Sequence, residues 1–136
     1  MKRSVLFPLV VLMVCLCAVS VGCKKRTAAI EDIYNTNLST YGKLTANQVH
    51  DAIIRGGSNA GWAMKDEKPG LVVATLSQRE HGVTVEIPYT AKEYTIHYRS
   101  SVNMDDDGTG QIHRNYPNWI NRLSRAINAE LAQIKK

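Results

Sequence analysis

The sequence has few of the features that mark a catalytic or disulfide-stabilised protein. It has three cysteines, Cys15, Cys17 and Cys23, and no internal repeat. It contains no Walker loop, no GxGxxG, no CxxC pair, no HExxH and no GxSxG. Without such a motif there is no recognisable catalytic constellation. The sequence therefore predicts neither a catalytic residue nor a cofactor.

The first 22 residues have the pattern of a secretory signal peptide. Lys2 and Arg3 precede an uncharged run from Ser4 to Gly22, and a charged start before an apolar middle is typical of such leaders. The run is also long enough for a short membrane helix, which needs roughly 17–25 apolar residues. An uncleaved helix and an unmodified secreted protein are therefore the alternatives to a leader cleaved after residue 22.

Cys23 stands directly behind this leader. The segment VSVGC, Val19–Cys23, resembles the lipobox of bacterial lipoproteins, in which the thiol is diacylated and the leader is cut before the cysteine. The usual Leu three positions before the cysteine is Ser20 here. Cleavage would remove Cys15 and Cys17, so Cys23 would have no disulfide partner. We therefore expect acylation at Cys23, with membrane lipid as its partner.

Size and charge limit the part of the chain behind the leader. Cleavage would leave 114 of the 136 residues, which suffices for one small domain. It would also lower the net charge from +5 to +3. A basic chain can favour nucleic acid, but export would put that partner out of reach, so none is expected. Residues 24–43 are mostly polar, so we expect residues 23–43 to be a lipid-anchored tether before a single domain at residues 44–136.

Two helices are predicted in this domain. Thr45 followed by Gln48 is a capping box, which marks a helix start, and helical apolar spacing continues to Gly61. The pair Gly56–Gly57 inside this helix indicates either a close approach of another element or an early helix end. An apolar stripe within residues 116–134 predicts the second helix.

Between the helices, apolar and polar residues alternate with a period of two. This alternation within residues 62–104, interrupted by short turns, predicts four antiparallel strands. Two helices laid on one face of such a sheet would bury both apolar stripes. The sequence thus predicts an α+β fold, a two-layer sandwich in the order helix–four antiparallel strands–helix, with both helices on one sheet face. Trp62 and Trp119 are expected in its core.

The sheet face away from the helices is the candidate surface for binding a partner. Alternation places polar side chains of two adjacent strands on it, and an antiparallel sheet can leave one face open to water. An ordinary solvated face is the alternative interpretation. The residues predicted to form this surface are Thr84, Glu86, Thr95, His97, Arg99 and Ser101.

One loop partly matches a calcium-binding loop. Asp105, Asp107 and Thr109 have the spacing of the first ligands of an EF-hand, but Tyr116 stands where a bidentate Glu is needed. Aspartates beside glycines also form solvated turns. A plain turn is therefore the favoured interpretation, and calcium the alternative. The four histidines show no metal-ligand spacing, so no other metal site is predicted.

Two stretches carry a resemblance to known proteins. AIIRGGSNAGWAM (residues 52–64) and QIHRNYPNWINRL (residues 111–123) look like a group of small uncharacterised envelope lipoproteins of Gram-negative bacteria. The likeness covers most of the chain after the leader and includes the motif HRNYPNWI. It implies a periplasm-facing lipoprotein domain and brings no catalytic residues.

The expected function is therefore that of a lipid-anchored, periplasm-facing envelope protein. It would be a non-enzymatic binding or adaptor module for an envelope protein or a cell-wall partner. Lys24 stands where an Asp favours inner-membrane retention in enterobacterial lipoproteins, so the outer membrane is expected. The alternatives are a small metal-dependent or hydrolytic enzyme that uses His97, His113 and the aspartates, and a calcium-binding lipoprotein.

Overall fold

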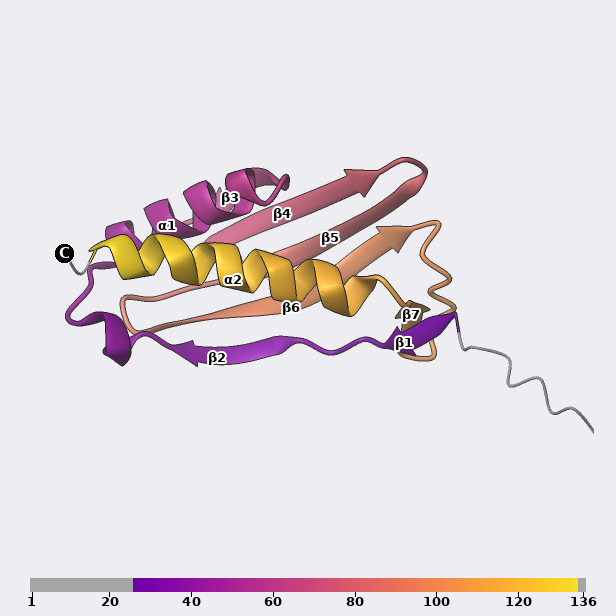
Figure 1. Cartoon of the computed structure of the whole chain (residues 1–136), viewed down its shortest axis with the longest axis horizontal. Coiled ribbons are helices and arrows are strands. Elements are labelled where there is room, and N and C mark those ends of the chain that lie inside the picture. The colour runs from indigo at the N-terminus through magenta and orange to yellow at the C-terminus, as the bar shows by residue number, and fades with distance from the viewer. Residues whose placement is uncertain (1–25, 135–136) are drawn as a thin grey trace, which may run out of the picture.

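Two helices pack on a mostly antiparallel sheet in the computed structural model, which describes residues 26–134 (Figure 1). The helices are α1 (Ala46–Asn59) and α2 (Tyr116–Ile134), and they lie side by side over the sheet (Figure 1). The predicted α+β class is thereby confirmed. Within residues 26–134, no helix is both long and apolar enough to cross a membrane. The predicted leader and Cys23 lie outside the described residues.

The strands form two separate sheets. The main sheet has five strands in the order β2-β6-β5-β4-β3, and every neighbouring pair is antiparallel. The second sheet is an antiparallel pair of β1 and β7. The strands are β1 (Thr27–Ala29), β2 (Ile33–Asn37), β3 (Ala63–Lys68), β4 (Leu71–Gln78), β5 (His81–Pro88), β6 (Glu93–Val102) and β7 (Gln111–His113).

The predicted order of one helix, four strands and one helix is corrected by three further strands. β1 and β2 precede α1, in a segment that was expected to be part of a tether, and β7 precedes α2. β2 pairs along β6, with Ile33 opposite Ile96. A 3₁₀ turn at Ser39–Tyr41 comes next, and Leu38 before it is only 1% exposed. Residues 27–41 are thus part of the folded domain.

The local signals at α1 are confirmed. The Thr45 hydroxyl accepts a hydrogen bond from the Gln48 amide, and the Gln48 side chain accepts one from the Thr45 amide. Gly61 lies just past the helix end with φ +88°, in the left-handed region that glycine adopts without strain. A Cβ atom on Gly56 would lie 2.6 Å from the Cα of Ile127. The predicted close approach is therefore real, and the neighbour is α2.

The core lies between the helices and the sheet. Trp62 is 4% exposed, as predicted, whereas Trp119 is only partly buried and packs at the margin of the core. Trp119 is less buried because, at 100° per residue, its side chain lies at the edge of the apolar stripe of α2. The centre of that stripe is buried and consists of Tyr116, Ile120, Leu123, Ile127 and Leu131.

Candidate functional site

Polar side chains gather on the face of the main sheet that points away from the helices. Residues directly opposite each other on antiparallel strands point to the same face. Glu86 lies opposite His97, and Thr84 lies between Thr75 and Ser100, with the two threonine hydroxyls 3.2 Å apart. We call this surface the open face. Its members are Glu67, Val73, Thr75, Thr84, Glu86, His97, Arg99 and Ser100. Thr95, which was also predicted on this surface, is buried, with 7% of its surface exposed.

A β-bulge in β6 decides which side chains reach the open face. The pairing register shifts between Thr84 and Val85 of β5, which leaves Arg99 of β6 as an extra residue. Beyond a one-residue shift the alternation of side chains is reversed. Ser100, rather than Ser101, therefore lies opposite Thr84 on the open face.

Two predictions fail because of this bulge. Ser101 was predicted on the open face, but it pairs with the buried Val83, and its hydroxyl oxygen lies 2.8 Å from that of Tyr98, which donates its proton to Asp106. Regular alternation along the strand from Tyr94 also predicts that Val102 points into the core, but Val102 pairs with Gly82 and is 63% exposed. Nothing in the period-two pattern indicates where an inserted residue falls, so only the strand pairing reveals the reversal.

An ion-pair network crosses the middle of the open face. Arg99 Nη1 lies 3.0 Å from Glu67 Oε1 and 3.4 Å from Glu86 Oε1. The three side chains come from three different strands, β6, β3 and β5. Surface ion pairs contribute little to stability, so this network matters less for the fold than for the pattern of charge that it presents on the surface.

A second polar cluster lies at the β2 side of the open face. Because a carboxylate only accepts hydrogen bonds, the Nδ1–H of His97 donates to Asp32 Oδ2, at 2.8 Å. The other carboxylate oxygen of Asp32 accepts the Tyr98 amide, also at 2.8 Å. The ring of Tyr34 stands edge-on to the His97 ring, with centroids 5.4 Å apart, and is 66% exposed.

These contacts favour the ionised form of the Asp32 carboxyl group. Partial burial by itself would raise its pKa, but hydrogen bonds from His97, the Tyr98 amide and Tyr34 outweigh the burial and bring the pKa below its usual value. Conversely, the hydrogen bond to Asp32 raises the pKa of the Tyr34 hydroxyl. Asp32 is thus an ionised carboxylate that orients the His97 ring, with Nε2 on the side of the ring away from the pair.

Two shallow hollows flank the ion-pair network. One, of about 300 Å³, is lined by Thr95, His97 and Pro88 among others. The other, of about 240 Å³, is lined by Thr84 and Ser100 among others. A larger hollow of about 660 Å³ lies elsewhere, around Leu38, Lys43 and Lys92, and contains none of the predicted site residues. We favour the open face as the site, because side chains that line its hollows are oriented by hydrogen bonds: His97 by Asp32, and Thr84 by Thr75.

The remaining candidates from the sequence are dispersed. His113 stacks on His81, with ring centroids 5.3 Å apart, while His97 pairs with Asp32, so the two histidines have different partners. In the loop that partly matches a calcium-binding loop, Asp107 Oδ1 accepts hydrogen bonds from the amide and the hydroxyl of Thr109, at 3.0 and 2.6 Å. Across residues 26–134, no group of three or more His, Cys, Asp or Glu residues is arranged to hold a metal ion.

Sequence reasoning missed three members of this site. Asp32 and Tyr34 lie in the segment predicted to be a tether, and Glu67 lies at the end of a strand. The signal in the sequence that this segment packs on the domain is its set of apolar residues, Ile30, Ile33, Leu38 and Tyr41. Comparison of the chain with protein-family models, curated proteins and solved structures found no match. The site is therefore interpreted from its own geometry.

Proposed function

We propose that this protein is a lipid-anchored module of the bacterial cell envelope whose open face binds a protein or cell-wall partner. Acylated Cys23 would hold it to the membrane, on the periplasmic side of the outer membrane. The observation that carries the binding function is the ion-pair network of Arg99 with Glu67 and Glu86, set between two hollows on a face that the helices leave uncovered.

This arrangement supports a binding role for two physical reasons. Charged groups held in fixed positions select a partner by complementarity more than they add raw affinity. The hollows add concave surface beside them, which a flat solvated face would lack. The polar cluster of Asp32, Tyr34 and His97 extends the same surface to the β2 edge.

Photo-cross-linking in intact envelopes tests the binding role. A photoreactive residue replaces Ser100 on the open face, and a matched control replaces the exposed Ser58 on α1. A discrete protein or wall adduct from position 100 only is expected, and mass spectrometry would identify it. Substituting Arg99→Ala in the same background should weaken that adduct. No adduct at position 100, or the same adducts at both positions, would contradict the proposal.

The anchor is tested separately by labelling cells with radioactive palmitate. The wild-type protein should be labelled, and Cys23→Ala should be unlabelled and unprocessed because it lacks the thiol that is acylated. Label retained in Cys23→Ala would reject the anchor while leaving the open face untouched.

A second function is favoured by one observation, the Asp32–His97 pair. An aspartate that holds Nδ1 of a histidine fixes the tautomer and the orientation needed for Nε2 to act as a general base. The corresponding activity would be that of a small hydrolase. Hydrolysis of an activated ester by the purified protein, lost in both Asp32→Asn and His97→Gln, would support it. Hydrolysis that survives both substitutions would exclude this pair as its source.

A further inference from the structure

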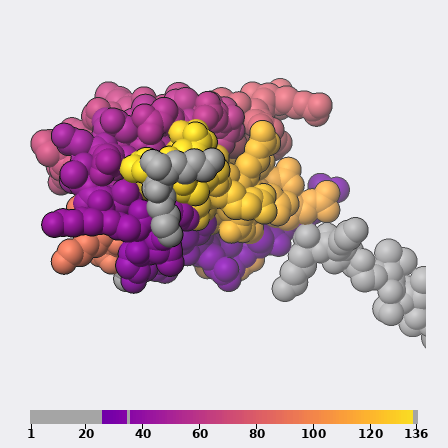
Figure 2. All heavy atoms as spheres, turned by 60° about the vertical axis from the view of Figure 1, so that its left-hand side comes forward, coloured from indigo at the N-terminus to yellow at the C-terminus, as the bar shows by residue number. Residues whose placement is uncertain are grey.

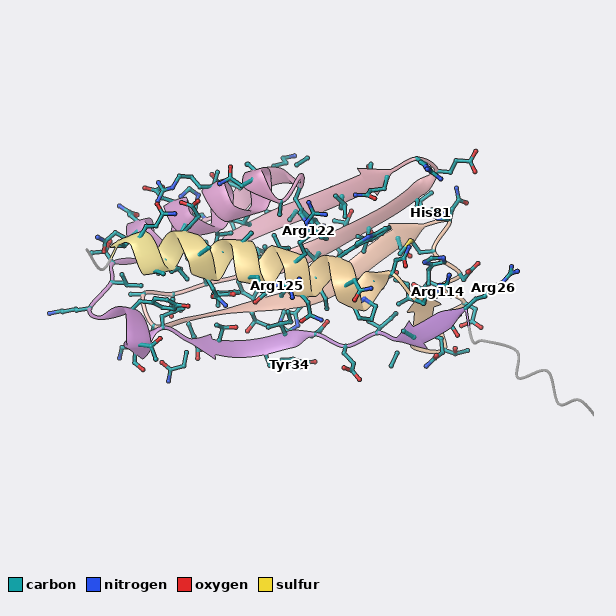
Figure 3. All side chains as sticks on the ribbon, in the orientation of Figure 1. Arg26, Tyr34, His81, Arg114, Arg122 and Arg125 are labelled. Carbon is teal, nitrogen blue, oxygen red and sulfur yellow. The ribbon has the colours of Figure 1, made fainter. Side chains whose placement is uncertain are left out.

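We propose that the α2 side of the domain lies against an anionic lipid surface, so that the open face points away from the membrane. This inference rests on the proposed acyl anchor at Cys23. The surface in question, the arginine side, consists of Arg26, Arg114, Arg122 and Arg125 (Figure 3).

The described part of the chain enters the fold at Arg26, beside β7. The Arg114 amide donates a 2.9 Å hydrogen bond to the Arg26 carbonyl, and β1 then pairs with β7 from Thr27 onward. Cys23 is only three residues before Arg26, and three residues span at most about 11 Å. Acylation at Cys23 would therefore hold this end of the domain at the membrane, with no room for the long tether that the sequence predicted.

The helix α2 begins close to that entry point. β7 ends at His113 and α2 begins at Tyr116, so the start of α2 lies next to the β1–β7 pair (Figure 1). In the space-filling view α2 (yellow) lies at the surface. The part of the chain that contains α1 (magenta) lies on one side of it, and the indigo part that contains β1 and β2 lies on the other (Figure 2). An anchor at residue 23 thus brings the exposed side of α2 within reach of the headgroups.

The exposed side of α2 carries positive charge. At 100° per residue, Arg122 and Arg125 lie opposite the buried stripe of α2, and both are exposed. The acidic residue of α2, Glu130, is already bonded to Arg55 and Asn59 of α1, at 3.1 and 3.0 Å. Among residues 26–134, no ion pair joins Arg122 or Arg125 to a carboxylate. Their charge is therefore available to an anionic surface.

The open face has the opposite character. Its carboxylates already face cationic or imidazole partners, since Glu67 and Glu86 contact Arg99 and Asp32 contacts His97. Anionic lipid would meet carboxylates there, whereas along the exposed side of α2 it meets Arg122 and Arg125. Basic residues close to a membrane surface are attracted to anionic lipid over about a Debye length, so charge selects the arginine side.

Fluorescence energy transfer to labelled headgroups tests this orientation. The full lipidated protein is placed in vesicles of phosphatidylethanolamine and phosphatidylglycerol that carry an acceptor on the headgroup. A donor is attached to Ala129→Cys on the exposed side of α2 or, in a second variant, to Ser100→Cys on the open face. We expect transfer from position 129 to exceed that from position 100 by about twofold, and the excess to fall in about 1 M salt, where screening is strong.

Charge variants identify the cause. Arg122→Gln with Arg125→Gln should reduce the transfer from position 129 to the level of position 100. The matched control Lys65→Gln with Lys68→Gln removes the same charge from the exposed strand β3 and should leave the transfer unchanged. Vesicles of phosphatidylcholine alone should give equal transfer from both positions.

The outcomes separate the orientation from the anchor. Protein that carries palmitate but gives equal transfer from positions 129 and 100, or more from position 100, would overturn the orientation and leave the anchor standing. Protein without palmitate would overturn the proposed anchor itself. An excess at position 129 that survives the double arginine substitution would also reject the charge-based orientation.

Discussion

At the scale of single residues, two buried tyrosines differ in what their hydroxyls contact. Tyr94 reaches from β6 to α2, where its hydroxyl lies 2.9 Å from Asn128 Oδ1 and 3.0 Å from Ser124 Oγ. The Tyr116 hydroxyl is buried without a hydrogen-bond partner among residues 26–134. A buried polar group stabilises a fold only when it is bonded, so the two hydroxyls should have opposite effects on stability.

Substitution by phenylalanine measures this difference. Tyr94→Phe should lower the free energy of unfolding by about 1 kcal/mol, because it leaves Asn128 and Ser124 without their partner. Tyr116→Phe should be neutral or raise it by up to about 1 kcal/mol, since only an unbonded hydroxyl is lost. Urea unfolding at neutral pH checks both. A loss of similar size in the two variants would contradict the assignment.

The same tyrosines predict how stability changes at alkaline pH. Burial raises the pKa of both Tyr94 and Tyr116 above the ordinary tyrosine value. The unfolded chain therefore releases these protons first, so stability is full below about pH 10 and falls as the pH rises further. Tyr116→Phe should make this fall shallower in unfolding curves recorded at increasing pH. An unchanged slope would mean that Tyr116 titrates normally.

His50 gives a second pH dependence, near neutrality. Its Nε2 lies 2.8 Å from Asp66 Oδ1, and this hydrogen bond, with a smaller one to Asp51, raises the His50 pKa although partial burial lowers it. A raised folded-state pKa stabilises the fold below the unfolded value of about 6.5, and the effect disappears as the pH rises through the folded-state pKa.

The corresponding measurement compares His50→Gln with the wild type. The loss of unfolding free energy should be larger below about pH 6 than above about pH 9. Asp66→Asn should remove the same pH dependence, because it removes the main partner of the imidazolium. A difference between His50→Gln and wild type that stays constant with pH would show that His50 acts by packing alone.

At the scale of elements, the contact between α1 and α2 depends on one glycine. A Cβ on Gly56 would meet the backbone of Ala126 and Ile127 at 2.6 to 2.8 Å. A Cβ on Gly57 would meet the sulfur and terminal methyl of Met64 at 2.2 and 2.4 Å. Helix backbone cannot move aside locally, whereas the end of a methionine side chain can.

The two alanine substitutions should therefore differ. Gly56→Ala should cost about 1–3 kcal/mol or more through overpacking, with loss of the close helix contact. Gly57→Ala should be close to neutral, because a helix gain of up to about 1 kcal/mol offsets the movement of Met64. Thermal or urea unfolding of the two variants decides this. Equal costs would mean that α2 can shift to accept a methyl group.

The elements also differ in how well they could be predicted. The helix ends of α1 and the long hairpin strands result from local signals: the capping box at Thr45, the glycine at position 61, and alternation in β4 and β5. The strands β1 and β2 have no such signal, since they are short and their partners β7 and β6 lie far along the chain. The bulge at Arg99 likewise has no pattern in the sequence that indicates it.

At the scale of the whole molecule, residues 27–41 belong to the folded domain. Leu38 is fully buried, and β2 covers what would otherwise be the free edge of β6. A soluble chain starting at residue 44 should be less stable than one starting at residue 24 by about 3 kcal/mol or more. It should also aggregate, because β6 becomes an exposed edge strand.

Urea unfolding and light scattering of the two chains test this. Leu38→Ala in the longer chain measures the contribution of this one buried side chain, and it should lower the free energy of unfolding by about 2–5 kcal/mol. Substitution of the exposed Ser39 by alanine should change the free energy of unfolding little. Equal stability of the chains starting at residues 24 and 44 would restore the prediction that this segment is only a tether.

The sequence by itself determined the α+β class, the two helices and the strands β3 to β6, because capping residues and hydrophobic periodicity act between near neighbours. It also indicated His97, Glu86 and Arg99 as members of one surface. Only the tertiary structure decided that Asp32 and Tyr34 join them, that Ser100 replaces Ser101, and that residues 27–29 and 33–37 are strands. Those features depend on pairing between distant segments and on a shift of register, and neither leaves a local pattern in the chain.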